Sequence, residues 1–302
     1  MATLPIPPSE LILNKDGSVY HLNLLPKHLA PTIITVGDPD RVDLVASYFD
    51  SIEYTVHKRE FRTITGYYKG KRITVISTGI GTDNIDIVLN ELDALVNIDL
   101  INRSVKKEHT SLDIIRIGTS GAIQADIPLD SFLLSKIAIG LDALLHFYDS
   151  KHIQSIPSAE AFIKHMSWSS EKSVPYVISC NESLASFFES ENVLKGCTAT
   201  NIGFYAPQGR SLRLDTSDKE MNQKLESFRF PTNQADDHEN RITNLEMETA
   251  GIYGLSSLLG HKAISLNAIL ANRALTNFST QAEKTIRSLI EFTLERIITI
   301  EN

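Results

Sequence analysis

The chain has 302 residues and a net charge of -8, with 42% hydrophobic and 22% charged residues. A chain of this length can bury a large core, and its composition is ordinary for a globular protein, with no bias toward a fibrous, disordered or membrane class. The acidic balance also argues against nucleic acid as the main partner, because binding a polyanion needs a broad positive surface. A single phosphate stays possible, since a few arginines and backbone N–H groups can hold it in an acidic protein.

The lack of a recognisable targeting signal predicts a cytoplasmic protein, and the positions of the cysteines and histidines predict no metal site. The first 17 residues lack a basic region followed by a long apolar run, and no stretch reaches the roughly 20 apolar residues of a membrane helix. Cys180 and Cys197 are too few for a disulfide framework, so we expect reduced thiols. The histidines are scattered without metal-ligand spacing, and no dinucleotide fingerprint, P-loop or nucleophile elbow occurs.

The first half of the chain repeats the order strand, glycine turn, helix. β-Branched apolar runs end at glycines, and apolar residues at helical spacing follow. This order predicts an α/β fold, in which ligands bind at the carboxyl ends of the strands. The units comprise strands 32–36, 73–76 and 114–117, turns at 37–38, 79–81 and 118–121, and helices from Pro39, with Asp38 as its cap, and from about Asp83.

The second half is less regular. No internal repeat, low-complexity tract or linker interrupts it, so we expect one α/β domain over residues 1–302. The predicted elements are a strand at 176–179, a helix and mobile loop within 213–240, a buried helix from Glu246 that Gly260 ends, a strand at 263–270 and a closing helix at 282–300.

The turn from Gly37 to Arg41 predicts a phosphate cradle. Glycine lets the backbone approach a ligand, the start of a helix presents free N–H groups, and Arg41 lies one turn in. An ordinary strand-to-helix turn with a solvated arginine explains the same residues equally well. The motif alone leaves both interpretations open.

Arg116 stands inside the apolar run 114–117. An unpaired buried guanidinium is too unfavourable, so the side chain must find anionic partners or reach water at the end of the strand. One interpretation is a core salt bridge to a carboxylate. The turn expected at 118–121 favours an anion site, because it puts hydroxyls and backbone donors beside the arginine.

Glu246 and Glu248 flank Met247 at the predicted start of the buried helix. Residues two apart on a helix point in different directions, so the two carboxylates need not share a task. A carboxylate here could accept hydrogen bonds from two neighbouring sugar hydroxyls. For Glu246, the preference of acidic residues for a helix N-terminus is an equally good explanation.

Gln208 and Arg210 follow an aromatic pair, Phe204 and Tyr205. In an extended loop, residues two apart turn toward the same side. An amide offers a donor and an acceptor to the edge of a planar base, and a guanidinium stabilises negative charge there. Without further information, a surface loop explains these residues better.

Together and in this order, the motifs resemble the nucleoside phosphorylase-I family, the superfamily of purine and uridine phosphorylases, and most closely its uridine phosphorylases. The resemblance implies a single-domain, three-layer α/β/α fold with a central mixed, partly barrel-like sheet. It also implies dimers, often stacked into hexamers, whose active sites are shared between subunits. The motifs that carry it are residues 19–22, 37–41, 58–61, 77–81, 116–121, 246–248 and 272–273.

The resemblance also implies the roles of individual residues, with phosphate as a co-substrate and no cofactor. Phosphate is assigned to Gly37, Arg41, Arg116, Thr119 and, from a neighbouring subunit, Arg59. Ribose is assigned to Met247, Glu248, Thr119 and, from the same neighbour, His21. The base is assigned to Gln208, Arg210, Phe204 and Gly121, and the catalytic residues are Arg116, Glu248, Arg210 and Gln208.

The implied activity is reversible phosphorolysis of uridine, with inversion at C1′ and α-ribose 1-phosphate as product. Purine-specific relatives carry an aspartate as general acid where this chain has Asn272 to Leu275, which favours the pyrimidine enzymes. Residues 82–84 depart from the turn at which some bacterial uridine enzymes build a monovalent cation site. The alternatives are a purine phosphorylase or nucleosidase of the same family, or a non-catalytic relative that binds or stores nucleosides.

Overall fold

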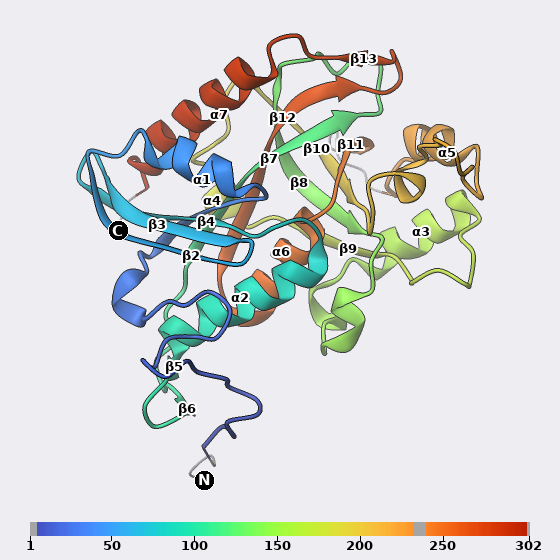
Figure 1. The fold of residues 1–302 in the computed structure, drawn as a ribbon. Helices are drawn as coiled ribbons and strands as arrows, with labels where there is room; N and C mark the ends of the chain where they lie inside the picture. The colour runs from blue at the N-terminus through green and yellow to red at the C-terminus, as the bar shows by residue number, and fades with distance from the viewer. Residues whose placement is uncertain (1–4, 232–239, 301–302) are drawn as a thin grey trace.

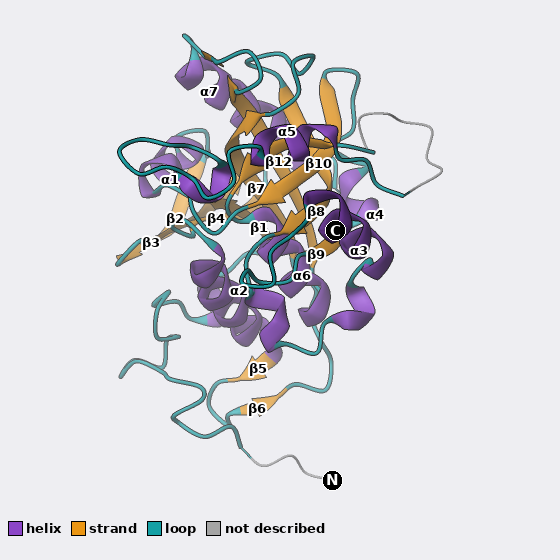
Figure 2. Ribbon diagram, turned by 90° about the vertical axis from the view of Figure 1, so that its right-hand side faces the viewer, coloured by secondary structure: helices purple, strands orange, loops and turns teal. Residues whose placement is uncertain are grey.

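A mixed β-sheet crosses the centre of the molecule, and helices cover it on both sides (Figures 1 and 2). The computed structural model describes residues 5–231 and 240–300. The helices are α1 (Pro39–Ala46), α2 (Thr82–Asn97), α3 (Ile156–Met166), α4 (Glu182–Ala185), α5 (Met221–Ser227), α6 (Thr249–Leu259) and α7 (Ala282–Ile297). Short 3-10 helices lie at Pro26–His28, Leu144–Phe147, Lys151–Ile153 and Ala206–Gln208.

The strands fall into one large sheet and one small pair. The large sheet holds β1 (Thr32–Val36), β2 (Ser51–Lys58), β3 (Phe61–Tyr68), β4 (Lys71–Ser77), β7 (Asp113–Ala122), β8 (Phe132–Gly140), β9 (Tyr176–Ser179), β10 (Val193–Thr200), β11 (Ile242–Glu246), β12 (Lys262–Asn272) and β13 (Asn277–Phe278). The pair is β5 (Ile98–Asp99) with β6 (Ser104–Val105).

Part of the large sheet closes on itself. Its order is β13-β12-β8-β10-β11-β7-β1-β4-β3-β2, and β12 also pairs with β7. Strands β12, β8, β10, β11 and β7 therefore form a ring, from which β1, β4, β3 and β2 extend as an open sheet. This arrangement confirms the expected mixed, partly barrel-like sheet.

The core explains why these segments fold as they do. Strand β1 is buried along its whole length and pairs in parallel with β4 and β7, as expected for a β-branched run in the middle of a sheet. Helix α6 packs on β8, β10 and β12, helix α2 packs on α6, and α7 packs on β7 and β12. Among the described residues, no helix is long and apolar enough to cross a bilayer.

The local predictions for the first two strand and helix units are confirmed. Helix α1 begins at Pro39 and the Asp38 side chain accepts a hydrogen bond from Asp40 N, while α2 follows the turn that contains Gly79 and Gly81. The strand predicted at 263–270 and the closing helix from 282 are also present, as β12 and α7. Gly260 ends helix α6 in the left-handed conformation, as predicted.

Two other local predictions are wrong, and a third is confirmed in part. Residues 118–121 do not turn but continue strand β7, because β12 pairs with them along one side. Glu246 does not begin a helix but is the last residue of β11, and α6 begins at Thr249. In the predicted helix and loop at 213–240, α5 supplies the helix, while positions 232–239 lie outside the described residues.

Candidate active site

The predicted phosphate residues gather where strand β1 ends beside the longer strand β7. The last pair between these strands joins Thr35 to Arg116, so the turn at Gly37 lies alongside Gly118 and Thr119. Arg41, in the first turn of α1, points back to this place, with Nη1 3.5 Å from Ile117 O. Within the described ranges, no carboxylate forms an ion pair with Arg41. Its positive charge is therefore available to a ligand.

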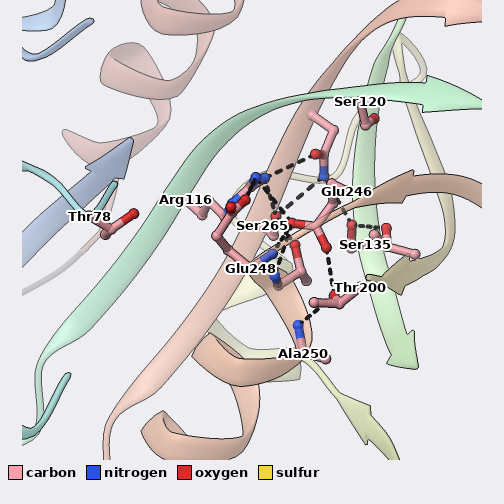
Figure 3. Close-up of polar contacts among 12 residues, drawn as sticks. Thr78, Arg116, Ser120, Ser135, Thr200, Glu246, Glu248, Ala250 and Ser265 are labelled. Atoms are coloured by element: carbon pink, nitrogen blue, oxygen red, sulfur yellow. Dashed lines mark hydrogen bonds and ion pairs between the residues drawn. The ribbon is translucent and has the colours of Figure 1, made fainter. Parts of the chain in front are cut away.

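Arg116 is buried in a polar cluster inside the ring of strands (Figure 3). Its Nη2 lies 2.6 Å from Glu248 Oε2 and 3.0 Å from Glu246 Oε2. On the other side, Nη1 donates to Asn267 Oδ1 at 3.0 Å and to Ser265 Oγ at 3.4 Å. The core ion pair that the sequence left open as an alternative is therefore present. It places a guanidinium with two carboxylates at one point of the fold.

Glu246 and Glu248 converge on the same guanidinium, so the expectation that they point apart is wrong. The reason is that they do not share a helix: one ends β11 and the other is the N-cap of α6. Glu246 also accepts hydrogen bonds from Thr200 Oγ1 and from the backbone N–H groups of Glu248 and Thr249. It thus caps α6, which confirms the role proposed for acidic residues at that helix start.

Glu248 is held from two sides and lies at the meeting point of three elements. Its Oε1 accepts a hydrogen bond from Gly81 N, at the start of α2, at 2.8 Å, while Oε2 faces Arg116. Met247, next to it in the connection between β11 and α6, is half-buried. A ligand that takes either partner from Glu248 leaves a carboxylate oxygen ready to accept another hydrogen bond.

Burial and charge shift the pKa values in this cluster. Burial raises the pKa of Glu248, and the Glu246 charge raises it further, although Arg116 opposes both. Burial acts to lower the pKa of Arg116, but the two glutamates outweigh it and the pKa is raised. Burial, followed by the charge of Arg116, lowers the pKa of Arg41. Because the positive charge of Arg116 disfavours the charged form of Arg41, an anion bound beside Arg41 would be stabilised.

Gly118 makes room for Arg116. A Cβ at this position would lie 1.7 Å from Arg116 Nη1, so the side chain of Arg116 folds directly over the glycine. Strand residues alternate between faces, and Thr119 therefore leaves β7 on the face opposite to Arg116. Thr119 is half-exposed, beyond the last pairing of β7 with β1. The turn predicted here is absent, because residues 118–121 belong to strand β7.

The predicted base residues come together at the 3-10 turn Ala206–Gln208. Arg210 Nη1 donates to Gln208 Oε1 and to Phe204 O, both at 2.6 Å. The Arg210 guanidinium carbon lies 3.9 Å from the centroid of the Phe204 ring. The loop is not extended as expected, because Gly209 adopts the left-handed conformation after the turn. The amide, guanidinium and ring are nevertheless neighbours.

Arg273 is a residue of this group that the sequence reasoning did not single out. Its Nη1 donates to Gln208 O, and its side-chain carbons lie 3.6 Å from the position of a Cβ on Gly121. Burial and the nearby charge of Arg210 lower its pKa to about 10. Arg273 therefore contacts both Gly121 and Gln208, two of the residues assigned to the base. The only local signal was the Asn272-Arg273 motif at the end of a strand.

His21 and Arg59 lie together, apart from the residues described so far. His21 Nδ1 lies 2.6 Å from Glu91 Oε1 on α2, and the guanidinium carbon of Arg59 lies 5.5 Å from the Tyr20 ring centroid. Arg59 is exposed at the turn between β2 and β3. In the described part of the chain, neither forms a hydrogen bond or ion pair with Arg41, Arg116 or Glu248.

The arrangement combines an anion site, a buried carboxylate and a polar edge with an aromatic ring. Arg41 and Arg116 can hold a small anion. Glu248 can accept hydrogen bonds from hydroxyls next to that anion. Gln208 and Arg210 can bind the edge of a flat ring and stabilise negative charge on it.

The sequence is similar to those of known nucleoside phosphorylases. A uridine phosphorylase of Thermococcus kodakarensis is 30% identical over 271 residues, which are 89% of this chain and 83% of that protein. A DeoD-type purine nucleoside phosphorylase of Shewanella oneidensis is 26% identical over 282 residues, which are 91% of this chain and 97% of that protein.

The fold resembles a solved structure, and most of the chain matches a family. The structure is similar to that of a Trypanosoma brucei nucleoside phosphorylase described as showing uridine phosphorylase activity, with a TM-score of 0.85 and 28% identity. That match covers 96% of this chain and 100% of the other. The sequence profile of the phosphorylase superfamily matches residues 31–298. The chain therefore belongs to the phosphorylase superfamily.

Proposed function

We propose that this protein is a pentosyltransferase that catalyses the reversible phosphorolysis of uridine to uracil and α-ribose 1-phosphate. The observation that carries the proposal is the pair of guanidiniums, Arg41 and Arg116, next to the buried carboxylate of Glu248. Similar proteins named uridine phosphorylases support the choice of uridine. Thr119 and Gly37 would complete the phosphate site, and Met247 would contact the ribose.

The reaction follows from where charge develops. As the bond from C1′ to the base breaks, its electron pair goes to the base and the ribose takes on oxocarbenium character. A phosphate oxygen, held by Arg41 and Arg116, stabilises the cationic sugar and bonds to C1′ on the face opposite to the leaving base. Inversion gives the α-phosphate. Gln208 and Arg210 stabilise the uracil anion, so a strong general acid is not needed.

We further propose that the active enzyme is a cytoplasmic dimer, or a hexamer built from three dimers, in which a neighbour supplies Arg59 and His21. This proposal rests on the family resemblance and on the separation of these residues from Arg116 within one subunit. Phosphate is the co-substrate, and no cofactor enters the proposed reaction.

A substrate panel with one variant pair tests the choice of base. The turnover of uridine, thymidine and inosine is measured for the wild type, for Arg210→Met and for a control, Arg213→Met. Arg213 is an exposed arginine of the same loop. Arg210→Met is expected to lower kcat/KM for uridine by about 10²-fold or more, as for other groups that stabilise developing charge. The control variant, Arg213→Met, should keep the kcat/KM of the wild type for uridine. Faster turnover of inosine than of uridine by the wild type would favour the purine alternative.

A further inference from the structure

A cavity of about 370 Å³ lies next to the base-binding turn at Ala206–Gln208. Its volume lies within the range of small-molecule sites, and its lining is mostly apolar, as in such sites. We call it the side pocket. Gln208, Arg210 and Arg116 do not line it, so it is distinct from the proposed active site. Its apolar lining residues are Leu141, Trp168, Ile202, Ala206, Pro207 and Met221.

Asn201, one of the residues that line the side pocket, carries a buried hydrogen-bond acceptor. Asn201 is 1% exposed, and its Nδ2 donates to Ala199 O. Among residues 5–231 and 240–300, its Oδ1 has no hydrogen-bond partner. Buried polar atoms are nearly always paired, and an unpaired one is unfavourable by about 1–3 kcal/mol. A ligand that brings an N–H donor to this atom would remove the penalty.

Other polar groups of the side pocket restrict the kind of ligand further. Trp168 provides an aromatic wall, and Lys172 Nζ lies 4.6 Å from the centroid of its ring. Asp218, which also lines the pocket, accepts two hydrogen bonds from Lys224 Nζ. The pocket thus offers apolar and aromatic surface, an ammonium donor and carboxylate acceptors. This set fits a flat heterocycle that carries both N–H donors and ring-nitrogen acceptors.

We propose that the side pocket binds a free purine-type base, with an N–H of the base donating to Asn201 Oδ1 and its ring packing against Trp168. We further propose that the bound base affects the active site, because the pocket and the active site share one turn of the chain. Ala206 and Pro207 line the pocket and directly precede Gln208, so a bound base holds the turn that carries the uracil-binding amide. This second part rests on the proposed function. It makes the ligand an effector of nucleoside binding.

The single tryptophan of the chain allows a direct binding test. The protein is labelled with 5-fluorotryptophan, so that its one ¹⁹F resonance reports on Trp168, and is titrated with adenine. The wild type should show a saturable shift. The same ring with every N–H methylated, 6-dimethylamino-9-methylpurine, should not shift the resonance. Asn201→Leu should weaken adenine binding about tenfold or more, as expected for the loss of a buried hydrogen bond.

A blocking variant covers the case in which Asn201→Leu does not fold. Ser217 lines the side pocket from an exposed segment, so Ser217→Phe should abolish the shift, while Ser186→Phe, at an exposed serine outside the pocket, should keep it. No shift at millimolar adenine would overturn the proposal. An equal shift in Ser217→Phe, or with the methylated purine, would do so as well.

The effector part is tested by kinetics. Saturating adenine should change the KM for uridine at least twofold in the wild type and leave it unchanged in Ser217→Phe. A ¹⁹F shift without any change in KM overturns the effector part. A ¹⁹F shift in a protein that does not turn over uridine overturns the proposed function and leaves the binding site standing. Turnover of uridine without a ¹⁹F shift supports the proposed function and overturns the binding site.

Discussion

Arg116 Nη2 and Glu248 Oε2 lie 2.6 Å apart, so the guanidinium assigned to phosphate holds the carboxylate assigned to ribose. Glu246 contacts the same guanidinium and keeps it in place. Phosphate that binds Arg116 would draw it away from Glu248 and free that carboxylate for the sugar hydroxyls. We therefore expect phosphate and nucleoside to favour each other's binding.

Replacing Arg116 should destabilise the fold as well as abolish phosphate use. Arg116→Met leaves the buried Glu246 and Glu248 without their cation, and breaking such a pair typically lowers the free energy of unfolding by about 3–5 kcal/mol. Urea denaturation measures the change. Adding Glu248→Gln to Arg116→Met should restore part of the loss, because one buried charge is removed.

The matched control for Arg116 is Arg287→Met. Arg287 pairs with Glu283 one turn away on the exposed face of α7, and such pairs contribute little. Its removal should leave the unfolding transition nearly unchanged. Arg116→Met with the stability of the wild type would contradict the ion pair described here.

The pH dependence of the reaction should report on Glu248. Burial raises the pKa of this carboxyl above its ordinary value of 4.5. The ionised form accepts the sugar hydroxyls, and it is lost as the pH falls through the raised pKa. The kcat/KM for uridine should therefore fall on the acid side, beginning above pH 4.5. Glu248→Gln should lower kcat/KM and flatten this acid limb, which an unchanged pH profile would contradict.

Two glycines of the site should respond differently to the same substitution. A Cβ on Gly37 would meet only Gly79 O at 3.5 Å, an ordinary contact, whereas a Cβ on Gly118 would collide with Arg116. Gly37→Ala should keep the melting temperature and raise the KM for phosphate about tenfold, because the methyl group occupies ligand space. Gly118→Ala should lower both stability and activity. An unchanged phosphate KM in Gly37→Ala would remove Gly37 from the site.

Subunit mixing tests whether Arg59 acts in a neighbouring site. Arg59→Ala and Glu248→Gln should each be nearly inactive alone. In a mixed dimer, one of the two sites receives both intact residues, so random mixing should recover about a quarter of wild-type activity. Differently tagged subunits allow the mixed oligomers to be purified. Their failure to regain activity would show that Arg59 serves its own subunit or none.

The features that the sequence could predict are local. Strand β1, the Gly37 turn and helix α1 follow from a β-branched run, a glycine and an Asp38 cap within about a dozen neighbouring residues. The spacing of Gln208 and Arg210 allows them to meet only in an extended loop, and a surface loop explains these residues better from the sequence alone. The loop instead takes a 3-10 turn with Gly209 in the left-handed conformation, which the sequence did not predict.

The features that the sequence could not predict depend on distant partners. Arg116 and Glu248 are separated by 132 positions, and no local pattern shows that they meet. The buried residues of strand β11 continue into the buried face of α6, so apolar spacing alone set the helix start too early, at Glu246. The small residues at 118–121 suggested a turn. They form a strand because β12 pairs with them and Gly118 accommodates the Arg116 side chain.

The central claim is that Arg41 and Arg116 hold phosphate as the nucleophile. Release of uracil from uridine by the purified protein, measured with and without inorganic phosphate, tests it most directly. We expect release only with phosphate, in equal amount with α-ribose 1-phosphate. Release at the same rate without phosphate, with free ribose as product, would show a nucleosidase and contradict the claim. No release in either condition would contradict it too and favour a binding protein.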